Sequence, residues 1–160
     1  VQTVEWSWFC GHCAAPAPGG MPPAPTARVC RVCGLGLLLE TRRDSLPNDR
    51  EAFLVIDSAL AIQAMSRRAQ ALLAVSEEEA VNRPVVELLA PAEAEAQGPS
   101  QFAASIVDAA HGDDEPTTAF VRPWNTFGIR IRARIAPCGP PRAALIVLQD
   151  PQDRRLHAVS

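Results

Sequence analysis

Residues 52–65 read AFLVIDSALAIQAM, and this stretch decides the fold of the chain. The apolar run over 52–57, which ends in Asp57, is typical of a strand buried in a sheet. Asp57 and Ser58 favour a turn, and the run over 60–65 predicts a second strand. The two strands are therefore expected to pair as an antiparallel hairpin.

Helices are expected directly after this hairpin. Ser66 can cap a helix over 67–73, because its side-chain oxygen can accept a free N–H of the first turn. Ser76 stands three residues before Glu79, which is the spacing of a capping box at the start of another short helix.

The second half of the chain predicts a short helix, a long helix and three strands. The short helix over 84–89 opens with Pro84, a residue favoured in a first turn. The long helix over 100–110 is amphipathic, and its inward residues are Phe102, Ile106 and Ala109. The strand-like stretches are 117–122, 127–136 and 143–149.

The order of these elements resembles that of a PAS domain. Residues 53–57 and 62–69 resemble the opening hairpin and first helix of that family, and 72–89 resembles its leucine-rich stretch that leads to an Arg-Pro pair. The ending LIVLQD, residues 145–150, is similar to its last strand and the acidic residue that starts its signalling connector. The resemblance spans roughly residues 50–155.

The resemblance implies an α+β fold in which a five-stranded antiparallel sheet carries its helices on one face. It also implies a pocket between helices and sheet, which holds a cofactor or is filled by side chains. The family senses ligands, redox state or light, or mediates protein contacts, and fold alone does not decide among these functions.

Two cysteine pairs near the N-terminus are the strongest chemical signal in the sequence. They are Cys10-Gly-His-Cys13 and Cys30-Arg-Val-Cys33. This spacing is that of a four-cysteine zinc site, in which Zn²⁺ is held tetrahedrally at roughly 2.3 Å from each sulfur. Residues 1–40 therefore resemble a zinc ribbon.

The predicted zinc is structural, because four sulfur ligands fill its coordination shell and the Pro-rich loop between the pairs offers no base. His12 is a spare candidate ligand between two better-placed thiols.

The alternative is that the thiols form two disulfides or stay free. The opening VQTVE lacks the features of a signal peptide, and disulfides are rare in the cytosol. Cys138 is expected to be a small residue at a turn or strand end.

The expected organisation has four parts: a zinc-ribbon module over 1–40, a polar linker over 41–50, a PAS-like domain over 51–155 and a tail or connector over 156–160. The chain has 160 residues and a net charge of −3, which becomes about −5 when four thiolates bind one Zn²⁺. This charge gives no general attraction to nucleic acid or membranes. No run approaches the ~18 apolar residues of a membrane span, and a cytoplasmic location is expected.

Haem and flavin are not expected as cofactors. The stretch 90–110 lacks the reactive cysteine of flavin-photochemistry PAS domains, and His111 precedes an acidic turn, unlike a haem ligand in a pocket. The chain has no tyrosine, which excludes a tyrosine-linked chromophore. An empty pocket or a small apolar ligand remains, and the candidate pocket residues are Trp124, Asn125, Phe102 and Ile106. The alternative for Trp124 is a core or sheet-covering role.

A stripe of arginines alternates with apolar residues over 129–135. With a period of two, the isoleucines face the core, and the other face carries Arg130, Arg132 and Arg134. One interpretation is a solvated sheet face. The other is an interface for a protein partner, for the zinc ribbon, or for a second subunit in a homodimer. Acidic residues of that subunit, either 77–79 or Glu93 and Glu95, could pair with the arginines.

The sequence contains no Ser-His-Asp arrangement, phosphate-binding glycine loop or carboxylate pair beside a histidine, so an enzyme is not expected. The predicted function is a non-enzymatic sensory or regulatory signal-transduction module that acts through protein contacts or a small ligand.

Two alternatives stay open. One is a transcriptional regulator that binds nucleic acid through the ribbon, with Arg28, Arg31, Arg42 and Arg43 as its local positive charge. The other is a thiol redox sensor from which oxidation ejects zinc.

Overall fold

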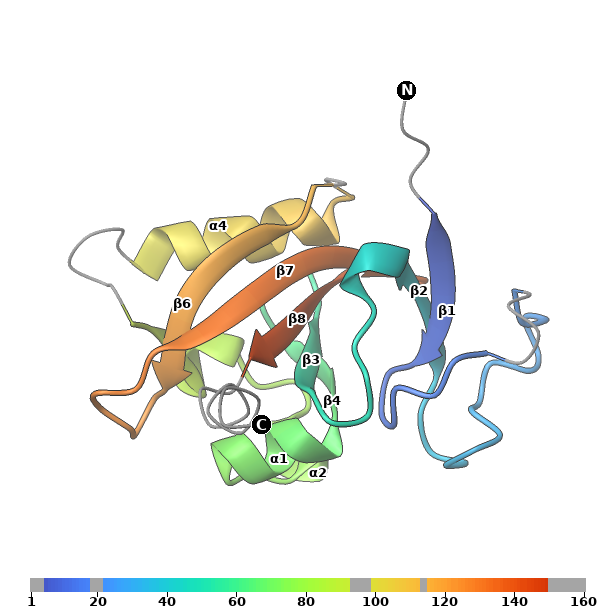
Figure 1. The fold of residues 1–160 in the computed structure, drawn as a ribbon, viewed down its shortest axis with the longest axis horizontal. Helices are drawn as coiled ribbons and strands as arrows, with labels where there is room; N and C mark the ends of the chain where they lie inside the picture. Colours follow the sequence, from blue (N-terminus) through green and yellow to red (C-terminus); the bar gives the residue numbers. More distant parts are fainter. Residues whose placement is uncertain (1–4, 18–21, 93–98, 113–114, 150–160) are drawn as a thin grey trace, which may run out of the picture.

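The computed structural model describes residues 5–17, 22–92, 99–112 and 115–149 (Figure 1). The strands are β1 (Trp6–Cys10), β2 (Leu38–Arg42), β3 (Ala52–Ile56), β4 (Ile62–Met65), β5 (Leu89–Pro91), β6 (Thr117–Pro123), β7 (Ile131–Gly139) and β8 (Ala143–Gln149). The helices are α1 (Arg67–Leu73), α2 (Glu77–Ala80) and α4 (Pro99–Ala110), with 3₁₀ turns η2 (Arg43–Ser45) and η3 (Val85–Glu87).

An antiparallel sheet with the order β6-β7-β8-β3-β4 forms the body of the molecule. This agrees with the five-stranded antiparallel sheet and the α+β class expected from the sequence. The predicted hairpin over 52–65 is confirmed as β3 and β4. The sheet is larger than expected, because β5 pairs with β6 and the β1–β2 hairpin also joins it.

The β1–β2 hairpin extends the sheet from the edge of β7 that also carries β6. Glu40 and Thr41 of β2 pair with Gly139 and Cys138 at the end of β7, and the buried Thr41 hydroxyl donates to the carbonyl of Pro137 at 2.8 Å. Figure 1 shows this hairpin at the opposite end of the molecule from β6. The first two residues of the expected linker over 41–50 are therefore part of a strand.

The helices lie on one face of the sheet, as expected. Ser66 caps α1 by accepting the N–H of Ala69, and Ser76 caps α2 by accepting the N–H of Glu79. The long helix α4 packs over β7 and β8. Its inward residues are those predicted: Phe102, Ile106 and Ala109 are all buried in the main core.

The opposite face of the sheet is covered by the N-terminal hairpin. Phe53 and Val55 of β3, with Leu145 and Val147 of β8, form a second core with Phe9, Ala14 and Leu39. All five residues of β3 and the first six of β8 are buried. This two-sided burial is the physical reason that 52–56 and 143–148 are continuous apolar runs, since strands with one solvated face alternate apolar and polar residues.

Two predicted elements differ in their bounds. The helix expected over 84–89 is the 3₁₀ turn η3, preceded by Pro84 and followed, after Leu88, by β5. The strand expected over 127–136 begins only at Ile131 and runs to Gly139. Gly128 has φ +78°, which breaks the extended backbone before Ile131. Ile129, expected in the core, is consequently 40% exposed.

Contact between the hairpin and the sheet predicts a measurable coupling between Phe9 and Phe53. Their rings meet edge to face, with centroids 6.0 Å apart, and each residue is 1% exposed. Each change to alanine is expected to lower the free energy of unfolding by about 3–5 kcal/mol. In a double-mutant cycle by urea denaturation, we expect a coupling of about 0.5–1.5 kcal/mol. If the losses in unfolding free energy of the two single variants simply add in the double variant, the two rings do not interact, which would contradict a docked hairpin.

Candidate metal centre

The two cysteine pairs are held by the same kind of turn. Cys10 ends β1, and Cys30 lies in the segment that precedes β2. In both pairs the residue after the second cysteine adopts a positive φ, 67° at Ala14 and 70° at Gly34. Its N–H donates to the carbonyl of the first cysteine of the pair, at 3.0 Å for Ala14 and 2.9 Å for Gly34. The two turns therefore present their sulfur atoms in equivalent ways.

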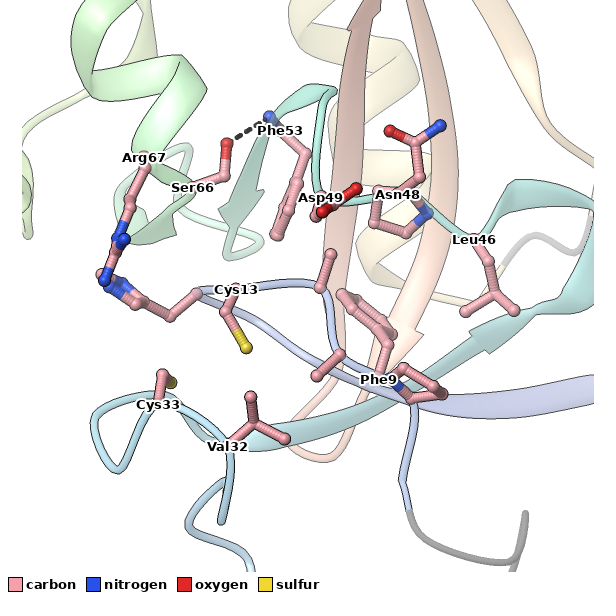
Figure 2. Close-up of a pocket in the computed structure, with 15 residues that line it drawn as sticks. Phe9, Cys13, Val32, Cys33, Leu46, Asn48, Asp49, Phe53, Ser66 and Arg67 are labelled. Carbon is pink, nitrogen blue, oxygen red and sulfur yellow. Dashed lines mark hydrogen bonds between the residues drawn. The ribbon is translucent and has the colours of Figure 1, made fainter.

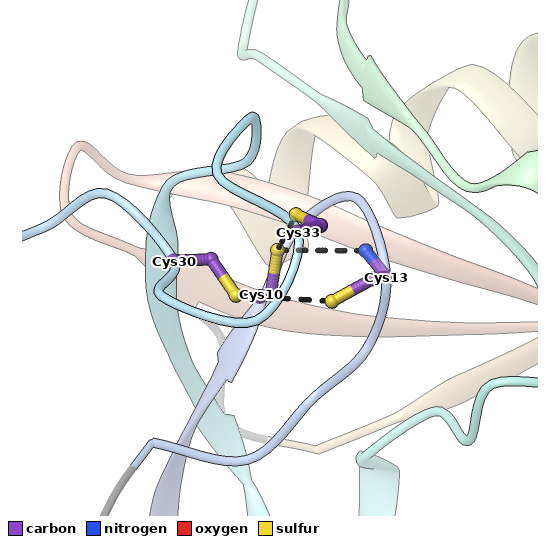
Figure 3. Close-up of side chains that lie close together, drawn as sticks. All are labelled: Cys10, Cys13, Cys30 and Cys33. Atoms are coloured by element: carbon purple, nitrogen blue, oxygen red, sulfur yellow. Dashed lines mark hydrogen bonds between the residues drawn. The ribbon is translucent and has the colours of Figure 1, made fainter.

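The four sulfur atoms converge between these turns (Figure 3), and all lie within 4.8 Å of one another. The Sγ atoms of Cys10 and Cys33 are 3.7 Å apart, and those of Cys13 and Cys30 are 3.8 Å apart. A tetrahedral site with metal–sulfur bonds of roughly 2.3 Å has sulfur–sulfur edges of about 3.8 Å. The measured separations fit this tetrahedron, whereas disulfide sulfurs are bonded at about 2.05 Å. The four cysteines can therefore hold a metal ion.

Backbone N–H groups surround these sulfurs. Those of His12 and Cys13 point at Cys10 Sγ at 3.3 and 3.4 Å, that of Val32 at Cys30 Sγ at 3.4 Å, and that of Gly36 at Cys33 Sγ at 3.4 Å. N–H donors favour the ionised form of a thiol. Such outer-shell donors also orient metal ligands. Both effects suit a metal-binding set of thiolates.

The ionisation of these thiols differs from one position to another. Burial raises the pKa of Cys10 and, less strongly, that of Cys13. Burial also acts against ionisation at Cys33, but the N–H donors of Leu35 and Gly36, with the sulfurs of Cys10 and Cys13, lower its pKa to about 6. A buried thiolate needs a compensating positive charge, and a divalent cation at the centre of the four sulfurs would supply it.

A hydrogen bond ties the second turn to the first, because the N–H of Gly11 donates to the carbonyl of Leu37 at 2.9 Å. The second turn is also closed on itself, since the N–H of Cys30 donates to the carbonyl of Gly36 at 2.8 Å. A small apolar cluster encloses the sulfurs, made of Cys10, Ala17, Cys30 and Leu38, with Trp8 packed against it. The neighbouring aromatic residues lie elsewhere: Phe9 faces the sheet, and Trp6 is 39% exposed.

His12 links the centre to the sheet domain. Its Nδ1 lies 3.6 Å from Oε2 of Glu77, and its side chain is 12% exposed. The same carboxylate oxygen accepts the N–H of Met65 at 2.9 Å, at the end of the edge strand β4. His12 therefore contacts the first turn of α2, a role that its position between two cysteines did not suggest.

Two cavities flank the hairpin where it meets the sheet. The larger, about 790 Å³, is walled by Cys13, Cys33 and Val32 on one side and by Phe53, Ser66 and Arg67 on the other (Figure 2). The smaller, about 480 Å³, lies between Leu35, Leu37 and the outer face of β3 and β4. His12 lines both cavities. Both are formed by segments far apart in the sequence, so no local pattern could have predicted them.

The predicted pocket residues do not come together as a group. Phe102 and Ile106 are part of the main core, 3% and 0% exposed. Trp124 is 56% exposed, and Asn125 is exposed beside it in the turn after β6. None of the four lines either cavity described above. Assignment of these residues to a ligand pocket stays a prediction.

The three arginines of the stripe have different surroundings. Arg132 is exposed, and Arg130 lies over the ring of Phe120, with its Cζ 3.8 Å from the centroid. Arg134 is half-buried and donates to the carbonyl of Ser45 at 3.3 Å. Arg134 therefore helps hold the segment after β2, and the exposed part of the stripe is Arg130 and Arg132.

Cys138 is separate from the four-cysteine cluster. It is 5% exposed and belongs to the second core beneath the hairpin. Burial raises the pKa of its thiol to about 12, so the thiol is neutral at physiological pH. Its place near the end of β7 agrees with the expected small residue at a strand end.

Comparisons with known proteins return structures that are similar to this chain. The PAS domain of nitrogen regulation protein NR(II) from Vibrio parahaemolyticus is 16% identical, with a TM-score of 0.46 over 64% of this chain and 91% of that one. A PAS domain from Colwellia psychrerythraea is 19% identical, with a TM-score of 0.48 over 62% and 85%. The photoactive yellow protein domain of the sensor histidine kinase Ppr from Rhodospirillum centenum is 15% identical, with a TM-score of 0.47 over 63% and 85%.

No family model and no curated protein matches the chain. Among the described helices, none has the length and apolar character that crossing a membrane requires.

Proposed function

We propose that the chain is a non-enzymatic sensory or regulatory module, a PAS-like domain whose outer sheet face carries an N-terminal hairpin fixed by structural zinc. The module acts through protein contacts or a small ligand. The observation that carries the proposal is the convergence of four sulfurs at the end of a hairpin that packs on the sheet. Across the two cysteine pairs these sulfurs lie 3.7 and 3.8 Å apart.

Zinc is the metal that this donor set favours. Four thiolates with tetrahedral spacing leave no open coordination position, so the ion stabilises the fold and performs no catalysis. Cys10, Cys13, Cys30 and Cys33 would hold it. Bound zinc would keep the turns around the two pairs together, and through Phe9 and Leu39 it would keep the hairpin against β3 and β8.

The sheet supports the sensory part of the proposal. The residues that resemble a PAS domain form the sheet and its helical face in the expected order, from β3 to β8. The space under α4 is occupied by core side chains such as Phe102, Ile106 and Ile131. The two cavities beside the four cysteines give a small ligand room between the hairpin and the outer face of the sheet, so this boundary is where a signal would act.

The nucleic-acid alternative is weakened by what its arginines contact. Arg28 donates to the carbonyls of Leu38 and Pro140. Arg42 forms a two-point contact with Asp44, and Arg43 pairs with Glu5. Two of the four local arginines are thus paired with carboxylates and a third is held against backbone carbonyls, which leaves fewer free guanidinium groups for phosphates.

Metal analysis of the purified protein, combined with an absorption spectrum, tests the proposal. We expect about one zinc per chain, because a closed thiolate site holds zinc, and no visible band, because the sequence lacks the residues that bind flavin or haem in this family. A chain that contains no zinc after reconstitution with zinc under reducing conditions would contradict the metal part. A stoichiometric visible chromophore would contradict the cofactor part.

Self-association through the outer sheet face gives a further prediction. Arg132 is exposed and lies opposite Phe120 in the register of β6 and β7. We expect Arg132→Glu to weaken homodimer formation, since it reverses the charge that acidic residues of a second copy would meet. Sedimentation velocity over a concentration series measures this effect. Arg68→Glu, an equal charge change at an exposed position of α1, serves as the control, and unchanged sedimentation of both variants would count against the interface.

A further inference from the structure

The four sulfur ligands differ in their access to solvent. Cys10 and Cys30 are buried, with 0% and 2% exposure. Cys13 and Cys33 are half-buried, and both line the cavity of about 790 Å³. Figure 2 shows them on one wall of this cavity, opposite Phe53. A small molecule inside the cavity therefore reaches one sulfur of each pair and leaves the other shielded.

Each sulfur on the cavity side has a buried sulfur of the other pair as a close neighbour. Cys33 Sγ lies 3.7 Å from Cys10 Sγ, and Cys13 Sγ lies 3.8 Å from Cys30 Sγ. Contraction to a disulfide bond of about 2.05 Å requires a movement of less than 2 Å along each of these directions. The bonds that this geometry favours join the two cysteine pairs to each other, and neither bond lies within a Cys-x-x-Cys pair.

We propose that Cys13 and Cys33 are the sites at which a small hydroperoxide, entering through the cavity, oxidises the metal centre. This inference rests on the proposed zinc-thiolate site. Its products are the disulfides Cys10–Cys33 and Cys13–Cys30.

The chemistry takes place in two steps for each disulfide. The sulfur of Cys33 attacks one peroxide oxygen and the O–O bond breaks, which leaves a sulfenic acid on Cys33 and, after one proton is taken up, one water. The thiolate of Cys10 then attacks the sulfenic sulfur; the S–O bond breaks, and hydroxide leaves and is protonated to water. Two thiolates are oxidised and one hydrogen peroxide is reduced. The same sequence joins Cys13 to Cys30.

Oxidation would exchange one crosslink for another. With all four thiolates consumed, no ligand remains for the metal and the ion leaves. The two turns stay joined, because both disulfides run between them. The cavity wall loses its thiolate charge while the hairpin remains attached to the sheet, which distinguishes this product from a chain whose hairpin is released.

The test uses the zinc-loaded full chain, treated with a graded amount of hydrogen peroxide. Zinc release is followed with a chromogenic indicator, and disulfides are mapped by alkylation and mass spectrometry under non-reducing conditions. We expect about two peroxides to be consumed per zinc released, with Cys10–Cys33 and Cys13–Cys30 as the products and Cys138 still reduced. Disulfides within each pair, or equal early modification of all four thiols, would overturn the proposal.

A cavity-filling variant gives the matched test of access. Ala15 lines the cavity, and Ala15→Phe places a ring in it while it keeps the backbone N–H and carbonyl of the turn. Ala59→Phe is the control, because Ala59 is exposed in the turn between β3 and β4 and lines neither cavity. We expect zinc release by peroxide to slow at least about threefold in Ala15→Phe and to be unchanged in Ala59→Phe. Equal rates in both variants at equal zinc content would overturn the route through the cavity.

Failure of this inference is distinguishable from failure of the proposed function. A chain that binds zinc but resists peroxide, or that forms other disulfides, keeps the structural zinc site and loses only the oxidation proposal. A chain that binds no zinc after reduction and reconstitution loses both.

Discussion

Replacement of Cys30 with serine is expected to abolish stoichiometric zinc binding and to release the β1–β2 hairpin from the sheet. Cys30 is 2% exposed and, with Cys10, is one of the two buried cysteines of the sulfur cluster. A serine hydroxyl is a neutral, poor zinc ligand, and three thiolates leave the ion open to water and to chelators. Structural zinc contributes an apparent 10–16 kcal/mol, by order of magnitude, to the folding of small zinc domains, so loss of one ligand removes most of what holds the two turns together.

The released hairpin would expose the outer face of the sheet. Phe53, Val55, Leu145 and Val147 now pack against Phe9, Ala14 and Leu39. We expect Cys30→Ser to bind a hydrophobic dye, to be cut by protease between the two cysteine pairs, and to unfold at a lower temperature, while the core under α4 keeps its helical circular dichroism. An excess of a strong zinc chelator should produce the same state in the unmodified chain.

Cys138→Ala is the matched control for this experiment. It removes a buried cysteine of the same second core, from a position outside the sulfur cluster. We expect it to lower the free energy of unfolding by about 1 kcal/mol, as for a small cavity, with zinc content unchanged. A Cys30→Ser chain that retains about one zinc through dialysis against chelator would contradict the metal centre.

The cysteine cluster and the sheet could be predicted from sequence because their signals are local. A Cys-x-x-Cys spacing fixes two sulfurs on one turn, and the run over 52–65 fixes a hairpin whatever its tertiary context. The predicted start of the strand that became β7 was wrong, because a change in backbone conformation decides where that strand begins. Gly128 adopts φ +78° and ends the extended chain, so the alternation that includes Ile129 and Arg130 starts before β7 does.

The sequence also contains a signal for the docking of the hairpin. The continuous apolar runs 52–56 and 143–148 require cover on two faces, and the helices supply only one. The residues that cover the second face, Phe9 and Leu39, come from a segment expected to be a separate module. The division into a module over 1–40, a linker and a domain over 51–155 stays a prediction, although β2 now runs through its boundary and pairs with β7.

Replacement of Gly36 with alanine is expected to disrupt the metal centre without removing a ligand. A Cβ atom at this position would overlap the sulfur of Cys10 and would lie 2.6 Å from the Cβ of His12. The sulfur of Cys10 cannot move freely, because Cys10 is fully buried. Gly36 is itself held in the second turn, because its carbonyl accepts the N–H of Cys30 at 2.8 Å. The second turn must therefore shift away from the first, which separates the sulfurs that now lie 3.7 and 3.8 Å apart.

Gly34→Ala separates this steric effect from the general consequence of losing a glycine. Gly34 has φ +70° and open space around its position, and the equivalent residue of the first pair, Ala14, already adopts φ 67° as an alanine. Gly34→Ala should thus lower stability by about 1 kcal/mol through backbone strain and keep full zinc content. For Gly36→Ala we expect zinc affinity to fall at least about a hundredfold, measured by competition with a chromogenic chelator, because a ligand moved by several tenths of an ångström no longer fits the tetrahedron. Equal zinc affinity in the two variants would mean that close contact between the turns is not what holds the four sulfurs in place.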